Sequence, residues 1–141
     1  MPERIAIERM TVLPDRIEAE LRIADERYRY VTPELAAEIR KRFPTVPFHT
    51  CRNAHGPTFE AVMDTTTLPH LFEHLVIDIQ THEHAAGTDP VQDSERALFT
   101  GTTQWSAEDP DVAIVRVSFL DDLIALGAFK KALNFINQVS V

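Results

Sequence analysis

The chain has 141 residues, of which 44% are hydrophobic, 26% charged and 8% aromatic. This is the length and composition of one soluble globular domain, and it excludes a disordered chain or a collagen-like repeat. The 14 Lys and Arg residues against 22 Asp and Glu residues leave a formal net charge of -8, which argues against nucleic-acid binding because that needs a positive surface.

The sequence also predicts a compartment. No apolar run approaches the ~20 residues that span a bilayer. The first residues, Met-Pro-Glu-Arg-Ile, lack the basic and then apolar build of a signal peptide. Cys51 is the only cysteine, so no internal disulfide can form. We expect one domain over residues 1–141 that is cytoplasmic and has no membrane partner.

The N-terminal segment is expected to form a β-hairpin followed by a helix. Apolar residues alternate with polar ones at 5–7 and again at 17–23, which is the period of half-buried strands. Residues 13–16, Leu-Pro-Asp-Arg, are typical of the turn between them. Thr32, which precedes a proline, is a predicted helix N-cap, and the helix should run to about Phe43.

Beyond this helix the pattern predicts further strands and helices. In chain order we expect an irregular segment at 44–57, a short strand at 58–63, a helix at 67–83, a polar loop at 85–95, strands at 97–105 and 112–120, and a helix at 121–137. The strands come in neighbouring pairs rather than alternating strictly with helices. The order therefore favours an α+β fold, a two-layer sandwich with an antiparallel-rich sheet and helices packed on one face.

The expected helix at 67–83 carries an H-x-x-E-H pattern at its N-terminal end. On a helix, residues four apart lie on one face, so His70 and His74 can ligate the same Zn²⁺. The carboxylate of Glu73 can then reach a water on the metal without being a ligand, which suits a general base. The pattern predicts a zinc hydrolase site with His70 and His74 as ligands and Glu73 as the catalytic residue.

The faces of this helix offer a second interpretation. At about 100° per residue, one apolar arc should face the core; it contains Leu68, Leu71, Phe72, Leu75, Val76 and Ile79. The opposite arc, with His70, Glu73 and His74, would then be an ordinary solvated face. Ile77 in the middle of that arc indicates instead that the face is partly covered, as a pocket wall would be. We expect Asp78, one turn further on, to pair with a neighbouring histidine.

A zinc site needs a third protein ligand. The candidates outside the helix are Asp121, Asp122, His49, Cys51 and His55. The two aspartates also suit the N-cap and the first turn of the last helix. A lone cysteine is commonly a small buried hydrophobic residue, and a Cys–His hydrolase is a further alternative.

Residues 70–80, His-Leu-Phe-Glu-His-Leu-Val-Ile-Asp-Ile-Gln, resemble a segment of the N-terminal domain of cyanophycin synthetases that reads roughly G-H-[IV]-[IV]-E-H-[IV]-A-L-E-L-Q. The upstream residues 49–51, His-Thr-Cys, are similar to that domain's H-x-C. Residues 99–103 lie where the family has a G-x-T/R-rich strand. Residues 112–119, followed by two aspartates, are similar to a strand that ends in aromatic-x-Asp-Glu. The similarity extends over most of the chain after about residue 45 and is specific only around the helix.

The resemblance implies a metallopeptidase-like site, in a domain that cleaves the Asp–Arg dipeptide polymer or only holds it. The H-x-x-E-H helix is also similar to that of pitrilysin-type peptidases and S-ribosylhomocysteine lyase, which share an α+β metallohydrolase fold. Carried over by position, His70 and His74 are zinc ligands and Glu73 is the base. Asp122 stands where the family has Glu as third ligand, and Pro69 replaces the Gly before the first histidine. No synthetase domains follow in the sequence, so we expect no polymerisation by this chain alone.

We therefore expect a zinc-dependent hydrolase-type domain that acts on a peptide or isopeptide substrate, such as an Asp–Arg dipeptide unit. The alternative is a non-catalytic polymer- or peptide-binding module that keeps the helix without the chemistry. A structural homo-oligomer is a third interpretation, because a short chain has few elements with which to wall off a deep cleft.

Overall fold

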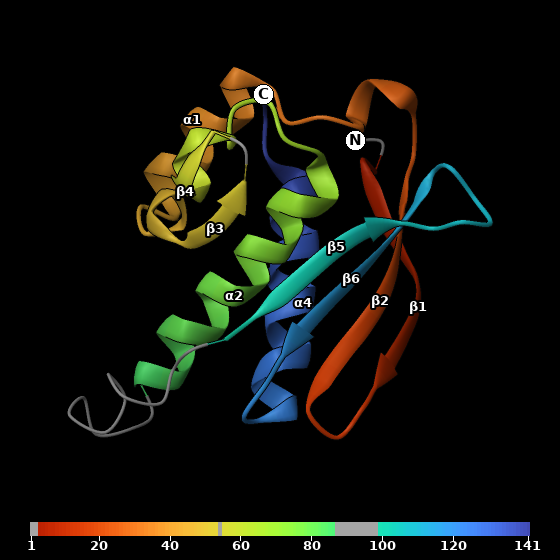
Figure 1. Cartoon of the computed structure of the whole chain (residues 1–141), viewed down its shortest axis with the longest axis vertical. Coiled ribbons are helices and arrows are strands. Elements are labelled where there is room, and N and C mark those ends of the chain that lie inside the picture. Colours follow the sequence, from red (N-terminus) through yellow and green to blue (C-terminus); the bar gives the residue numbers. More distant parts are fainter. Residues whose placement is uncertain (1–2, 54, 87–98) are drawn as a thin grey trace.

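The computed structural model describes residues 3–53, 55–86 and 99–141. A four-stranded antiparallel sheet forms one layer, and the long helices α2 (Leu68–Ala86) and α4 (Asp122–Gln138) pack together against one of its faces (Figure 1). The fold is therefore α+β with helices on one side of an antiparallel sheet, as the order of elements predicts. Within the described ranges, no helix combines the length and the apolar character needed to cross a membrane.

The larger sheet has the strand order β1–β2–β6–β5, and every neighbouring pair is antiparallel. Its strands are β1 (Ile5–Val12), β2 (Arg16–Ile23), β5 (Gly101–Trp105) and β6 (Val112–Ser118). The expected hairpin is present as β1 and β2, and the Leu13 N–H donates to the Arg16 carbonyl across the turn at 2.8 Å. Among the described residues, β1 and β5 are the edges of this sheet, and β5 contacts α2.

The hydrophobic core lies between the sheet and the two long helices. Alternate residues of β2, namely Ile17, Ala19 and Leu21, are fully buried. The whole apolar arc of α2 that the sequence predicts is buried as well, and Phe72 of α2 meets Phe129 of α4 with ring centroids 5.7 Å apart. Burial of this arc sets the rotation of α2 about its own axis, and so it decides where the opposite, polar face points.

The segment after the first helix contains more structure than expected. Helix α1 (Pro33–Arg42) begins as predicted, with the Thr32 hydroxyl accepting from the Leu35 N–H. It is followed by the 3-10 turn η2 (Val46–Phe48) and by the paired strands β3 (Thr50–Asn53) and β4 (Gly56–Thr58). Elements of three or four residues are too short to show a period in the sequence. In Figure 1, β3 and β4 lie on the other side of α2 from the larger sheet.

The strand expected at 58–63 is wrong, since the structure has a 3-10 turn there, η3 (Phe59–Ala61). Phe59 and Met63 are fully buried, but Ala61 between them is exposed. An alternation of apolar residues therefore does not correspond to an alternation of burial here, and the chain turns instead of extending.

Some other boundaries also differ from the expectation. Residues 85 and 86 of the expected polar loop complete α2, and the rest of that loop lies outside the described residues. The strand expected from residue 97 begins at Gly101, and residues 97 and 98 lie outside the described part of the chain.

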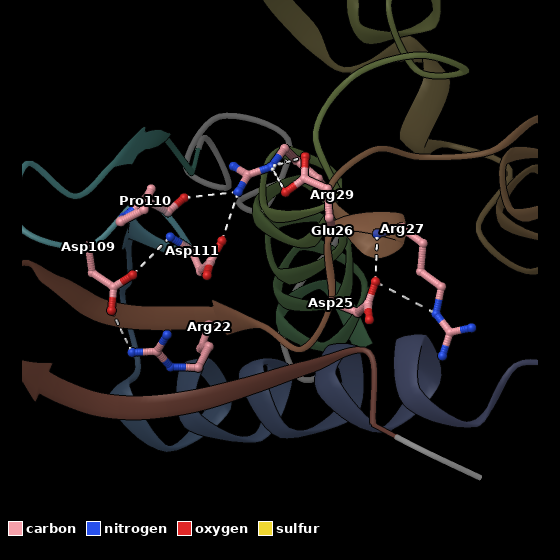
Figure 2. Close-up of polar contacts among 8 residues, drawn as sticks. All are labelled: Arg22, Asp25, Glu26, Arg27, Arg29, Asp109, Pro110 and Asp111. Carbon is pink, nitrogen blue, oxygen red and sulfur yellow. Dashed lines mark hydrogen bonds and ion pairs between the residues drawn. The ribbon is translucent and has the colours of Figure 1, made fainter.

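A group of charged residues joins the loop between β5 and β6 to the end of β2 and to the segment that follows it (Figure 2). Arg29 pairs with Asp111 at 2.9 Å, and Arg22 pairs with Asp109 at 2.7 Å. The Arg29 guanidinium also lies over the Trp105 ring, 4.4 Å from its centroid. These contacts hold the C-terminal end of β5, and with it Trp105, in place.

Candidate metal centre

The polar face of α2 is buried, not solvated. Glu73, His74 and Asp78 are only 4%, 3% and 2% exposed. Segments η2 and β3 cover this face from one side, and β5 covers it from the other. Ile77 is half-buried and packs against the core. The prediction that other elements partly cover this face of the helix is therefore confirmed, and the alternative of a solvated face is wrong.

Three potential metal ligands meet on this covered face, and we call them the Cys–His–His cluster. Cys51 lies on β3, and His70 and His74 lie on successive turns of α2; their ligand atoms all lie within 4.8 Å of one another. The Cys51 Sγ is 3.7 Å from the His70 Nε2, and the two imidazole centroids are 4.9 Å apart. Zinc bonds of about 2.0–2.3 Å at tetrahedral angles place ligand atoms about 3.3–3.8 Å apart. The cluster is close to that spacing, so its donor set fits a zinc-type ion.

The expected third ligand, Asp122, is not in the cluster, and Cys51 stands in its place. Asp122 is exposed in the first turn of α4, shortly after β6 ends at Ser118. The Gln80 side chain donates to the Ser118 carbonyl. Gln80 lies about 15 Å further along α2 than His70, at about 1.5 Å per residue. The end of β6, where the sequence places Asp122, is therefore at the opposite end of α2 from the first ligand.

Two other candidates also lie outside the cluster. Asp121 is the N-cap of α4, and its side chain accepts hydrogen bonds from the backbone N–H groups of Leu123 and Ile124. His55 is exposed between β3 and β4. The remaining candidate, His49, contacts the cluster without belonging to it.

A second set of contacts fixes the two imidazole rings. The Nδ1 of His70 is 2.8 Å from the Thr66 hydroxyl, and the Nδ1 of His74 is 3.0 Å from the Nδ1 of His49. The Phe59 ring stacks on His74 with centroids 4.0 Å apart. On both histidines the Nδ1 therefore has a neighbour outside the cluster. The Nε2 of His70 lies toward Cys51, and the Nε2 of His74 lies toward Glu73.

Glu73 reaches the same space from the side of β5. Its Oε1 accepts a hydrogen bond from the Thr103 hydroxyl at 2.7 Å, and its Oε2 is 3.8 Å from the His74 Nε2. Burial raises the pKa of Glu73 to about 7, although the Thr103 hydrogen bond and the charge of His49 act in the other direction. Gly101 makes room for this side chain, since a Cβ there would lie 2.8 Å from the Glu73 Cγ.

Burial also sets the protonation of the two histidines. It lowers the pKa of His70, and it lowers the pKa of His74 to about 3, with smaller contributions from the charges of His70 and His49. Both imidazoles are therefore neutral near pH 7, which is the form that binds a metal ion.

The cluster lines a pocket of about 730 Å³. Glu73 lies on the same side as the cluster, and every residue from 99 to 105 lines the pocket as well. Successive side chains of a strand point to opposite faces of its sheet. Because every consecutive residue of this segment lines the pocket, the pocket runs along the edge of β5 and not over one face of the sheet. At the C-terminal end of β5, the apolar residue that lines the pocket is Trp105, on whose ring Arg29 stacks.

The backbone of β5 directs hydrogen-bonding groups away from the sheet along this edge. The Ser118 N–H of β6 donates to the Thr100 carbonyl at 2.8 Å. The backbone N–H and C=O groups of the even-numbered residues of this segment therefore point toward β6. The alternation of an antiparallel ladder then turns the backbone N–H and C=O groups of Gly101, Thr103 and Trp105 to the other side. In the described ranges no strand pairs with that side of β5.

The sequence patterns predicted the helix residues of this site, and they ranked Cys51 below Asp122. The signal for Cys51 was the H-x-C spacing in the resemblance; in the structure its cysteine lies on β3 and its histidine, His49, ends the turn η2. Gly101 and Thr103 lie in the segment that resembles the family's G-x-T/R-rich strand, but nothing in the sequence pointed to their contact with Glu73. A thiol, two neutral imidazoles and a buried carboxylate can together hold a divalent cation and move a proton.

Comparison with known protein families, curated proteins and solved structures finds no match to this chain. The resemblance to cyanophycin synthetases therefore stays a prediction from the sequence.

Proposed function

We propose that this protein is a metal-dependent hydrolase of peptide or isopeptide bonds. Cys51, His70 and His74 would hold the ion, for which zinc is the first choice because thiolate and imidazole ligands suit it. Glu73 would act as the general base. The observation that carries the proposal is that three ligand atoms lie within 4.8 Å of one another beside a carboxylate that is only 4% exposed.

Glu73 has the position and the protonation of a residue that moves one proton. The Thr103 hydroxyl occupies its Oε1, so Oε2 is the atom that faces the His74 Nε2. A pKa of about 7 lets the carboxylate accept a proton from a water molecule in the pocket and return it to the leaving amine near neutral pH. A divalent ion, when bound, would supply Lewis-acid polarisation of the carbonyl under attack.

The edge of β5 supports a polypeptide-like substrate. An extended chain can pair with the outward backbone groups of an edge strand, and this pairing recognises a peptide backbone whatever its side chains are. Those groups lie at Gly101, Thr103 and Trp105, along the pocket wall. The net charge of -8 is compatible with a cationic or zwitterionic substrate, and the Asp–Arg unit that the resemblance implies is a zwitterion with an exposed guanidinium.

Two substitutions separate the roles of base and ligand. We expect Glu73→Gln to bind zinc as the wild type does but to lose hydrolysis by about 100- to 10,000-fold, which is the range that a general base contributes. His74→Ala should lose both zinc and hydrolysis, because a ligand holds the ion itself. The measurement is the release of new amino groups from Asp–Arg dipeptides and from peptides, with and without zinc, beside metal analysis of protein purified without a histidine tag.

His55→Ala is the matched control, since it removes an exposed histidine outside the cluster and should change neither readout. Zinc-stimulated cleavage that survives in Glu73→Gln would contradict the role of Glu73 as base. A wild-type protein that binds the Asp–Arg dipeptide polymer but cleaves none of the substrates would favour the non-catalytic binding module instead.

A further inference from the structure

A chain of hydrogen bonds runs from the Cys–His–His cluster to a buried carboxylate on α2. The Nδ1 of His74 is 3.0 Å from the Nδ1 of His49, and the Nε2 of His49 is 3.0 Å from the Oδ1 of Asp78. Asp78 is only 2% exposed and also accepts from the Thr45 hydroxyl. His49 therefore lies between one candidate ligand and a carboxylate one helical turn away from that ligand.

The donors and acceptors along this chain follow from its last member. An ionised carboxylate can only accept, so His49 donates to Asp78 from its Nε2. A neutral His49 then has only a lone pair at Nδ1, and that lone pair accepts the proton on the Nδ1 of His74. His74 is left with its own lone pair at Nε2, the nitrogen that faces Glu73.

We infer that His49 is a positioning residue that holds His74 in the tautomer needed to bind a metal. A histidine side chain in water prefers to carry its proton on Nε2, which is the nitrogen that this site needs free. The hydrogen bond at one ring nitrogen decides which tautomer is present and which nitrogen binds the ion. The inference rests on the proposed metal site but not on hydrolysis.

Thr66 does not fix His70 in the same way. Its hydroxyl lies 2.8 Å from the His70 Nδ1, but a hydroxyl can either donate or accept. Only the path through His49 ends on a group that cannot donate, so only that path gives the proton of a candidate ligand a defined place.

The tautomer can be measured directly on the metal-free wild type. Long-range proton–nitrogen NMR spectra of protein with ¹⁵N-labelled histidine, recorded with a chelator at about pH 8, distinguish the two tautomers above the ordinary pKa of histidine. We expect the proton on Nδ1 for His74 and on Nε2 for His49. A proton on the Nε2 of His74 would overturn the inference.

Two substitutions at residue 49 test the consequence for binding. The carboxamide of His49→Gln offers an acceptor and a donor, whereas the ring of His49→Phe fills space without either. We expect His49→Phe to weaken Zn²⁺ binding about 10- to 100-fold, the range for loss of the partner of a ligating histidine, and His49→Gln to recover most of it. His82→Gln is the matched control, because His82 contacts Asp78 from the exposed side at 3.5 Å and should leave Zn²⁺ affinity unchanged.

Zn²⁺ affinity is measured by competition with a chromophoric chelator, and circular dichroism shows which variants are folded. Equal affinity in folded His49→Phe and wild type would overturn the inference, and the wild-type tautomer decides the matter if that variant does not fold. Failure of hydrolysis is a separate result: a wild type with the expected tautomer and affinities that cleaves no substrate contradicts the proposed hydrolase and leaves the role of His49 standing.

Discussion

Glu73 and His74 are neighbours in sequence, and burial acts on them in opposite directions. It raises the pKa of the carboxyl group to about 7 and lowers the pKa of the imidazole to about 3. Both shifts disfavour the charged form, because a poorly hydrated site stabilises neither an anion nor a cation. The metal-free site is therefore close to neutral, and a bound cation would be the largest local charge.

The two groups should oppose each other in the pH dependence of stability without metal. The folded pKa of His74 lies below its ordinary 6.5, so its contribution to stability is lost as pH falls from about 6.5 toward 3. The folded pKa of Glu73 lies above its ordinary 4.5, so its contribution is lost as pH rises from about 4.5 to 7. Glu73→Gln removes the second effect, and its urea midpoint with chelator should fall more steeply than that of wild type between about pH 6.5 and 4.5. Parallel curves would contradict the raised pKa of Glu73.

Gly101→Ala tests how closely Glu73 is packed. A Cβ at Gly101 would lie 2.8 Å from the Glu73 Cγ and 3.0 Å from its Oε2, so the carboxylate must move. We expect a loss of about 1–3 kcal/mol in the free energy of unfolding, as for overpacking, and a loss of hydrolysis with zinc binding retained. Urea denaturation and the hydrolysis assay measure the two effects.

Gly127→Ala is the matched control for that change. Gly127 lies inside α4, and a Cβ there would meet no atom within 4 Å apart from its chain neighbours and the backbone of its own helix. Replacing a glycine in a helix by alanine typically stabilises by about 0.5–1 kcal/mol. If both glycine variants gained stability and kept activity, the close approach of Glu73 to β5 would be refuted.

At the scale of elements, α2 is unusual because both of its faces are buried. The sheet and α4 cover the apolar arc, while β3, η2 and β5 cover the polar one. A buried polar face is stable only if its groups find partners. Thr103 is the partner of Glu73, and His49 is the partner of both His74 and Asp78. The segments that cover this face of α2 therefore also supply the hydrogen bonds of the site.

Substitutions at the start of α4 separate helix capping from metal binding. Asp121→Ala removes an acceptor for two backbone N–H groups and should cost about 0.5–2 kcal/mol of stability. Asp122→Ala removes an exposed first-turn acid and should cost about 0.3–1 kcal/mol. Thermal unfolding measures both, and neither should change zinc affinity, whereas Cys51→Ala should weaken it strongly. Equal weakening by Asp122→Ala and Cys51→Ala would restore Asp122 as the third ligand.

At the scale of the whole molecule, the cluster joins two segments that are distant in sequence. Cys51 comes from β3, which follows α1, and the two histidines come from α2. An ion held between them would bind the folded chain and not the unfolded one. By mass action it should add about 2.7 kcal/mol when its free concentration is 100 times its dissociation constant.

This linkage predicts a zinc-dependent melting temperature. Under those conditions we expect the wild type to melt roughly 5–10 °C higher with zinc than with chelator, for a chain of this size. Cys51→Ala and His70→Ala should show little or no shift, while His55→Ala should shift like the wild type. A wild type whose melting temperature is the same with zinc and with chelator would contradict the metal site.

The local features of the fold and half of the site could be predicted from the sequence. It predicted the hairpin of β1 and β2, the Thr32 cap and the buried arc of α2, because strand alternation, capping and helical periodicity depend on residues close in the chain. It also predicted that His70 and His74 lie together, since a helix places residues four apart on one face.

Which other residues join these two histidines depends on how the elements pack in three dimensions. Asp122 follows a strand and opens a helix, which is locally the setting expected of the third ligand, but the end of β6 lies at the far end of α2 from His70. Cys51 and Thr103 reach the site because β3 packs across α2 and because β5 is the strand beside it. Strand order and packing are long-range relations, and the spacing of residues along the chain does not encode them.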